Sequence, residues 1–205
     1  MRFIELKNKL KGLTIFSIRD IEKIDKSIHP PRLVEWQAKG YIKKIIRGYY
    51  ILSELDINEF VLFTIANKIY KPSYVSFEMA LSYYRLIPES IYGITSASTR
   101  HTYKFNTEFG SFIYRKIKPK LMFGYKLVEY NNQTYKIAEI EKALIDLFYV
   151  KPHLNNDEDF EELRIDKQSF LEQINIEKLN NYLQVINSAV LSRRVKKFVR
   201  FIKNA

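Results

Sequence analysis

The spacing of apolar residues near the start of the chain predicts two helices followed by a tight hairpin. Ser17 and Asp20 form a capping-box pattern, and the isoleucines that follow recur every three residues, as on one face of a helix. The pair Pro30-Pro31 predicts the first turn of a second helix, because the N–H that proline lacks is not needed there. That helix ends before Gly40, and the period then becomes strand-like in two runs around the turn Arg47-Gly48.

The second predicted helix has an apolar face and a charged face. Successive helical residues are rotated by about 100°, which places Leu33 and Trp36 on the side that can pack on the first helix. Helix, turn, helix and a basic two-stranded ribbon form the order of a winged helix-turn-helix, whose second helix enters the DNA major groove. The residues expected to contact DNA are Arg32, Glu35 and Lys39 on the helix and Lys43, Lys44, Arg47 and Tyr49 on the hairpin.

Each of these residue types suits a different part of DNA. Arg32 and Lys39 can reach guanine edges or phosphates, and Glu35 can accept a hydrogen bond from cytosine. The cations of the hairpin are expected at phosphates or in the minor groove. Two other interpretations stay open, namely a small α/β subdomain with a solvated hairpin and a module that binds protein.

The rest of the chain predicts an α+β protein with two domains. A winged-helix domain is expected over residues 1–53, followed by a mixed α/β domain over 54–205 in which 151–205 form a helical extension. Asp56 with Glu59 and Ser76 are expected to cap helices, Ile4 to pack in the first domain, and the helix over 138–149 to bury one face. Helices are predicted over 1–10, 57–71, 77–84, 138–149, 176–186 and 190–202, and strands over 73–76, 92–98, 112–117, 125–130 and 133–137.

Positive charge is concentrated at the two ends of the chain. The formal net charge is +11. Residues 1–52 hold 12 Lys and Arg against 5 Asp and Glu, residues 53–190 hold 16 against 18, and residues 191–205 hold 6 against none. Clustered cations favour nucleic acid, because each neutralised phosphate releases counterions, and an anionic membrane surface is the competing partner.

Several other functional classes lack their sequence signals. The chain has no cysteine for disulfides or thiolate metal sites, no apolar run of about 18 residues for a membrane span, and a charged N-terminus unlike a signal peptide. We therefore expect a cytoplasmic protein without metal or cofactor.

Catalysis has little support in the sequence. Ser96, Ser98 and His101 can be drawn as nucleophile and base, but no glycine elbow or phosphate-binding loop accompanies them. Asp146 suits a paired structural carboxylate better than a catalytic one. We therefore expect a protein that is not an enzyme.

The order of several motifs resembles the AbiEi antitoxins of bacterial phage-defence systems. Four stretches of the predicted second domain carry the resemblance together with the N-terminal segment KGYIKKIIRGYYIL, and Arg85 stands where the family has a glycine. The four are PSYVSFEMALSYYRLIPE over 72–89, ITSASTRHTYKF over 94–105, FGSFIYRKIKP over 109–119 with FGY over 123–125, and YKIAEIEKALIDLFY over 135–149.

The resemblance implies two activities. The N-terminal winged helix would bind inverted repeats in double-stranded DNA of its own promoter and repress the operon. The C-terminal domain would counteract a nucleotidyltransferase-like toxin, as a type IV antitoxin without a stable complex. The alternatives are a ligand-responsive repressor with no toxin partner, and an enzyme that carries an accessory winged helix.

The last helix of the chain is strongly amphipathic. Its apolar stripe consists of Leu191, Val195, Phe198 and Ile202. It either docks on the core or adds an auxiliary contact to DNA, toxin or a membrane surface. The acidic run over 157–162 is expected to be a solvated loop or helix start, with a basic partner as its alternative. The cations of the possible auxiliary contact are Arg193, Arg194, Lys196, Lys197 and Arg200.

Overall fold

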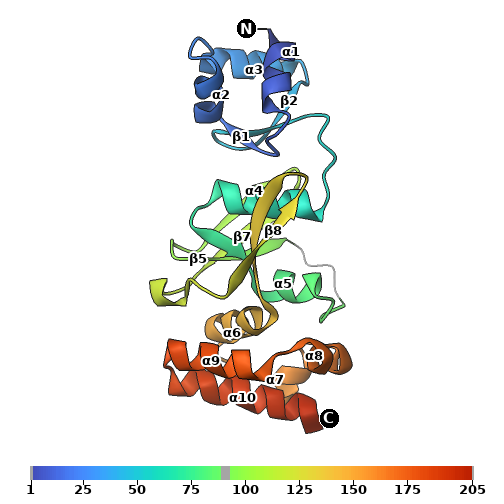
Figure 1. The fold of residues 1–205 in the computed structure, drawn as a ribbon, viewed down its shortest axis with the longest axis vertical. Helices are drawn as coiled ribbons and strands as arrows, with labels where there is room; N and C mark the ends of the chain where they lie inside the picture. Colours follow the sequence, from blue (N-terminus) through green and yellow to red (C-terminus); the bar gives the residue numbers. More distant parts are fainter. Residues whose placement is uncertain (1, 89–92, 205) are drawn as a thin grey trace.

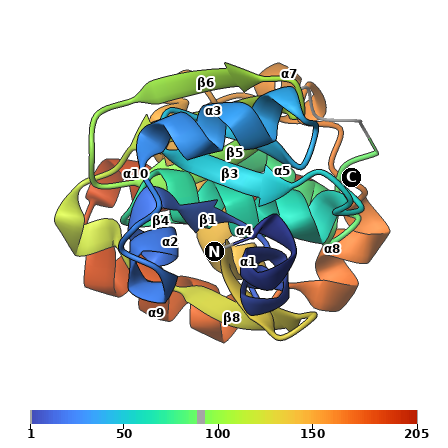
Figure 2. The ribbon, with the colours of Figure 1, turned by 90° about the horizontal axis from the view of Figure 1, so that it is seen from above.

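The computed structural model describes residues 2–88 and 93–204, and its N-terminal unit contains helices and a small antiparallel sheet (Figure 1). Figure 2 shows the three helices arranged around strands β1 and β3. The sheet order is β1-β3-β2. The helices are α1 (Phe3–Leu10), α2 (Ile18–Ile24) and α3 (Pro30–Ala38), and the strands are β1 (Phe16–Ser17), β2 (Ile42–Ile46) and β3 (Tyr49–Leu52).

Local signals in the sequence account for this unit. The capping box is confirmed, since the backbone N–H of Ser17 donates to the Asp20 carboxylate at 2.8 Å and Asp20 N–H donates back to Ser17 Oγ at 3.4 Å. Gly40 follows α3 with φ +69°, and Gly48 sits at the hairpin turn with φ +83°. Both values lie in the left-handed region that glycine adopts without strain.

Two hydrophobic clusters divide the described residues. The smaller cluster lies inside the N-terminal unit and buries Leu33 and Trp36, as predicted, whereas the expected packing of Ile4 is wrong because that residue is 57% exposed. Ile45 and Ile51 belong instead to the larger cluster of the second unit. The N-terminal sheet is therefore seated on the second unit, with α4 (Glu59–Ile69) between them (Figure 1).

A six-stranded mixed sheet forms the centre of the second unit, in the order β6-β7-β5-β4-β9-β8. Helix α4 covers one face, and α5 and α6 cover the other (Figure 1). Strand β6 was not predicted, and the predicted Tyr92 of the preceding strand lies outside the described residues. The strands are β4 (Ser73–Val75), β5 (Ile94–Ser98), β6 (Tyr103–Thr107), β7 (Gly110–Lys116), β8 (Tyr125–Tyr130) and β9 (Gln133–Ala138); α5 spans Phe77–Tyr83, a short 3₁₀ turn Pro119–Leu121, and α6 Ile140–Val150.

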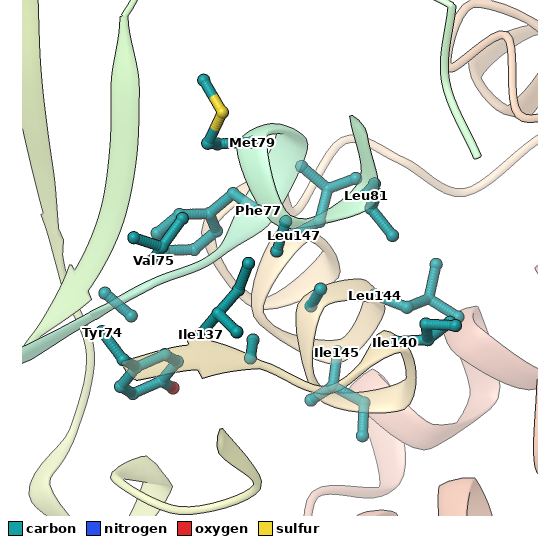
Figure 3. Close-up of a cluster of buried hydrophobic side chains, with 14 of the residues drawn as sticks. Tyr74, Val75, Phe77, Met79, Leu81, Ile137, Ile140, Leu144, Ile145 and Leu147 are labelled. Atoms are coloured by element: carbon teal, nitrogen blue, oxygen red, sulfur yellow. The ribbon is translucent and has the colours of Figure 1, made fainter. Parts of the chain in front are cut away.

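The C-terminal quarter is helical and lies against α6 (Figure 1). Because α6 is enclosed between the sheet layer and these helices, every residue from Ile140 to Phe148 is buried, and the expectation of a single buried face is wrong. Figure 3 shows side chains of α6 gathered with those of β4, β9 and α5. No helix within 2–88 and 93–204 is long and apolar enough to cross a membrane. The four added helices are α7 (Asp157–Glu161), α8 (Lys167–Gln173), α9 (Ile176–Ile186) and α10 (Ala189–Asn204).

A buried polar network ties α6 to β4. Lys142 and Asp146 are both 0% exposed and form an ion pair. The Tyr74 hydroxyl and the Ser76 hydroxyl donate to Asp146 at 2.7 and 2.8 Å, and Lys142 Nζ donates to the Tyr74 hydroxyl at 2.7 Å. Burial lowers the pKa of Lys142, and the Asp146 carboxylate opposes that shift. Asp146 is thus the paired carboxylate that was predicted.

Two of the predicted helix caps have different partners. Ser76 precedes α5 but makes no capping bond through its side chain, because its hydroxyl is used by Asp146. For α4 the cap is Asn58, which accepts from Val61 N–H at 3.1 Å, so the prediction of Asp56 is wrong. Asn58 Nδ2 also donates to the Tyr130 hydroxyl at 2.9 Å. This hydrogen bond holds the segment that links the two units against β8.

Arg85 adopts a conformation that glycine prefers. Its φ is +59°, directly after α5. Arg85 N–H donates to the Ser82 carbonyl at 2.8 Å, and Leu86 N–H donates to the Leu81 carbonyl at 2.9 Å. This is the Schellman pattern of a helix end, in which the left-handed residue is usually glycine.

Candidate nucleic-acid interface

The charged face of α3 lies at one end of the molecule (Figures 1 and 2). Leu33 and Trp36 hold the helix on the N-terminal core, so the opposite face is left to solvent. The side chains of Arg32, Glu35 and Lys39 are 48%, 38% and 52% exposed. The 100° rotation between helical residues therefore predicted the solvent-facing side correctly.

Glu35 holds both cations of this face. Arg32 Nη1 lies 3.0 Å from Glu35 Oε2, and Lys39 Nζ lies 2.7 Å from Glu35 Oε1. The hydrogen bond from Lys39, followed by the charge of Arg32, lowers the pKa of Glu35 despite an opposing effect of desolvation. The same bond raises the pKa of Lys39. A partner anion must therefore compete with Glu35 for these two cations.

The basic hairpin, which we define as β2, β3 and the turn Arg47-Gly48, adds three exposed cations to the same unit. Lys43, Lys44 and Arg47 are exposed, and Lys43 Nζ lies 5.6 Å from the centre of the Phe109 ring in the β6–β7 turn. Tyr49 is half-buried and packs on the larger core, so only part of its ring faces solvent. The hairpin thus presents charge chiefly through its lysines and Arg47.

Helix α10 does not join this surface. It lies at the opposite end of the molecule from α3 (Figure 1). Its apolar stripe is buried as predicted, and Arg193, Lys196, Lys197 and Arg200 are exposed. Arg194 contradicts the prediction of an exposed cation, because it is only 8% exposed. Its Nη1 donates to the carbonyls of Lys151 and Leu154 at 3.1 and 3.4 Å, at the end of α6.

Several of the other charged or reactive residues singled out in the sequence take part in contacts within the second unit. The acidic run begins α7, where Asn156 and Asp159 form a capping box. Ser96 and Ser98 are buried in β5, and Ser98 Oγ donates to the Pro72 carbonyl at 2.7 Å. His101 is exposed, and its carbonyl accepts from the Tyr70 hydroxyl at 2.8 Å. Ser98 is thus tied to the start of β4 within the sheet, and Ser96 Oγ is buried without a hydrogen bond among the described residues.

Sequence reasoning missed how the second unit contacts the N-terminal unit. Strand β6 contacts β2, and Lys68 Nζ of α4 lies 4.0 Å from Asp20 Oδ2, which belongs to the capping box of α2. Burial alone would raise the pKa of Asp20, but hydrogen bonds with Ser17 and the charge of Lys68 lower it. No local spacing signals such a contact, because Lys68 and Asp20 are separated by most of the N-terminal unit.

Comparison with models of known protein families finds no match, and comparison with curated proteins finds none either.

Proposed function

We propose that the N-terminal unit is a winged helix-turn-helix that binds double-stranded DNA, and that the chain is an AbiEi-type antitoxin that represses its own operon. The observation that carries the DNA-binding half is the combination of α3 and the basic hairpin at one end of the molecule. Arg32 and Lys39 are exposed on α3, and Lys43, Lys44 and Arg47 are exposed on the hairpin. Five exposed cations on two neighbouring elements suit a polyanionic partner.

In this proposal α3 enters the major groove and the hairpin contacts the flanking backbone. Phosphates and guanine edges compete with Glu35 for Arg32 and Lys39, so the ion pairs within α3 exchange for ion pairs with DNA. Glu35, once released, can accept a hydrogen bond from cytosine and repels a phosphate. Binding then needs the correct bases as well as negative charge, which is the basis of sequence selectivity.

The antitoxin half rests on the motif resemblance. The segment 135–149 that carries much of it forms β9 and α6, which are almost entirely buried. This segment therefore maintains the core of the second unit, whereas residues 100–104 of another motif are exposed.

The DNA-binding half is tested by measuring affinity for the chain's own upstream region and for scrambled DNA at several salt concentrations. We expect specific binding whose log K falls with log salt, and Arg47→Ala should reduce that slope by ~1. The matched control is Arg200→Ala, which removes an exposed arginine at the opposite end of the molecule and should leave the slope unchanged. Equal, weak binding to both DNAs would contradict the proposal.

The antitoxin half is tested in cells that express the neighbouring nucleotidyltransferase-like gene under separate control. The wild-type chain should restore growth. Arg47→Ala should weaken repression of a promoter reporter and still restore growth, because the hairpin lies in the other unit. Failure of the wild-type chain to restore growth would remove the antitoxin assignment and leave the repressor.

A further inference from the structure

We propose that the pocket between the two units binds a small anion that carries phosphoryl groups. The pocket has a volume of about 350 Å³ and is closed on one side by Ile15 of the N-terminal unit. Its other walls come from the end of α4, the start of β4 and the β8–β9 hairpin. It therefore lies where a bound molecule would touch both units.

The charge of the pocket favours an anion. Lys68, Lys71 and Lys136 line it, and the described residues that line it include neither aspartate nor glutamate, although Asp20 lies 4.0 Å from Lys68. Three lysines therefore contribute to the walls of one concave site, and Lys136 Nζ also lies 5.0 Å from the centre of the Tyr125 ring. A concave site lined by one sign of charge concentrates ions of the opposite sign.

Two lining residues carry hydrogen-bonding atoms that have no partner in the protein. Ser73 Oγ and Asn67 Nδ2 are both buried without a hydrogen bond among the described residues. The orientation of the Asn67 amide follows from its other contact, in which Oδ1 accepts from Lys136 N–H at 2.6 Å. Its NH₂ group is therefore the donor that remains. A phosphoryl group offers several acceptor oxygens to donors of this kind.

The pocket is also connected to the helix-turn-helix segment. Lys68 lines the pocket, and its Nζ lies 4.0 Å from Asp20 Oδ2, which accepts from the backbone N–H of Ser17 in the capping box of α2. The Gln133 side chain, another part of the pocket wall, donates to the Gly12 carbonyl. An anion that draws Lys68 toward itself weakens the link to Asp20. Bound anion would then change how the N-terminal unit is held, and this regulatory step rests on the proposed function.

The test of the site uses the full chain without DNA and inorganic pyrophosphate as the probe. Isothermal titration calorimetry at constant ionic strength should show that one pyrophosphate binds per chain. The double variant Lys68→Gln/Lys71→Gln should weaken binding at least tenfold, and Lys196→Gln/Lys203→Gln, an equal loss of charge on α10, should weaken it less than twofold. Absence of a one-to-one isotherm, or equal weakening in the two double variants, would overturn the site.

Asn67→Asp sharpens this test, because aspartate keeps the acceptor for Lys136 N–H and replaces the unpaired NH₂ group by a carboxylate oxygen. We expect pyrophosphate binding to be lost because the carboxylate repels the anion, and an unfolding midpoint measured in parallel verifies that the variant is folded. Retained binding would show that Asn67 does not face the ligand. Citrate is the second probe, and citrate that binds more tightly than pyrophosphate would overturn the preference for phosphoryl groups.

Regulation is tested separately by measuring affinity for the upstream DNA with and without saturating pyrophosphate at equal ionic strength. A several-fold change that is absent in Asn67→Asp would establish the coupling. Pyrophosphate binding without any change in DNA affinity would overturn the coupling and leave the site. If the wild-type chain binds no DNA, the proposed function fails while the titration still decides the anion site.

Discussion

Two lysine–carboxylate ion pairs of this protein have the same spacing along the chain, but one is exposed to solvent and the other is buried. Lys39 and Glu35 on α3, and Lys142 and Asp146 on α6, are both lysine–carboxylate pairs four residues apart. The side chains of the first pair are 52% and 38% exposed, whereas both members of the second pair are 0% exposed. Identical spacing therefore says little about the role of a charge, because burial decides whether the pair serves the fold or is available to a partner.

The energetic difference follows from solvation. Exposed pairs contribute little to stability, because water already solvates both charges and salt screens their attraction. Removing one member of a buried pair leaves the other charge without compensation, which typically costs about 3 to 5 kcal/mol. The network around Asp146 includes two further donors, Tyr74 and Ser76, so its loss affects both α6 and β4.

Lys142→Met should therefore cause the largest loss of stability, about 3 to 5 kcal/mol in denaturant unfolding. The substitution keeps much of the side-chain volume and removes the charge that compensates Asp146. The matched variant Lys39→Met on α3 should leave the unfolding midpoint nearly unchanged. Similar losses in the two variants would contradict the contrast between the helices.

A double variant isolates the buried interaction. Lys142→Met/Asp146→Asn should be more stable than the sum of the two single losses predicts, by about 1 to 3 kcal/mol, because the residues are in direct contact. Strict additivity would mean that the two charges do not stabilise each other in the folded protein.

The adjacent residues Arg194 and Arg193 repeat the comparison within one helix. Arg194 is buried and donates to two carbonyls near the end of α6, whereas Arg193 is exposed. Arg194→Gln should destabilise the protein by about 1 to 3 kcal/mol, because buried carbonyls lose a charged donor. Arg193→Gln should have little effect in the same thermal unfolding experiment. The prediction is wrong if the two substitutions shift the midpoint equally.

Glu78 lies between these extremes, with a side chain that is 21% exposed. Burial raises its pKa, but Arg115 and Lys151, each at 2.9 Å, lower it below the ordinary value. A carboxylate with a lowered folded-state pKa stabilises the fold above its unfolded pKa, and this contribution is lost as the pH falls through the folded value.

Glu78→Gln should therefore cost about 1 to 2 kcal/mol at pH 7, because two charge-assisted contacts are lost. Above about pH 5 the cost should be constant, since unfolded glutamate titrates near ~4.3. Below that pH the difference between variant and wild type should shrink, as measured by urea unfolding at pH 3 to 7. A cost that stays the same at pH 3 would rule out the ionised form as its source.

The same distinction shows what the sequence could predict. The cap of α2, the charged face of α3, the turn at Arg47-Gly48 and the bounds of α9 depend on residues close together in the chain, and their predictions are confirmed. Strand β6 was missed because it is an exposed edge strand whose identity depends on pairing with β7. The candidate contacts to DNA remain predictions, although the structure places those on α3 and the hairpin in one unit.

Features that depend on packing between distant segments were not predictable. Periodicity gave α6 one apolar face, but the C-terminal helices cover its other side, and Lys142 is buried against Tyr74 and Phe123. The spacing in the sequence predicts Arg194 on the solvated basic face of α10, but its side chain is buried because α10 packs against the end of α6. The lysines of the pocket between the units also come from α4, β9 and the segment between α4 and β4, which local spacing cannot bring together.

Glu35→Gln removes the charge that pairs with Lys39 on the exposed helix α3, and it should have the smallest effect on stability. Both oxygens of Glu35 pair with cations that remain exposed, so the unfolding midpoint should stay within about 2 °C of the wild type. The effect on DNA should be larger. Releasing Arg32 and Lys39 and removing one negative charge should raise the affinity for scrambled DNA several-fold and steepen its salt dependence.

Affinity for the upstream region should rise less than affinity for scrambled DNA, because glutamine reads cytosine poorly in place of glutamate. The ratio of the two affinities, measured at one salt concentration, should therefore fall. An unchanged ratio would mean that Glu35 only restrains the cations of α3 and does not contribute to base recognition. A large loss of stability would instead place this pair with the one on α6, and the distinction between exposed and buried charges would no longer hold for this protein.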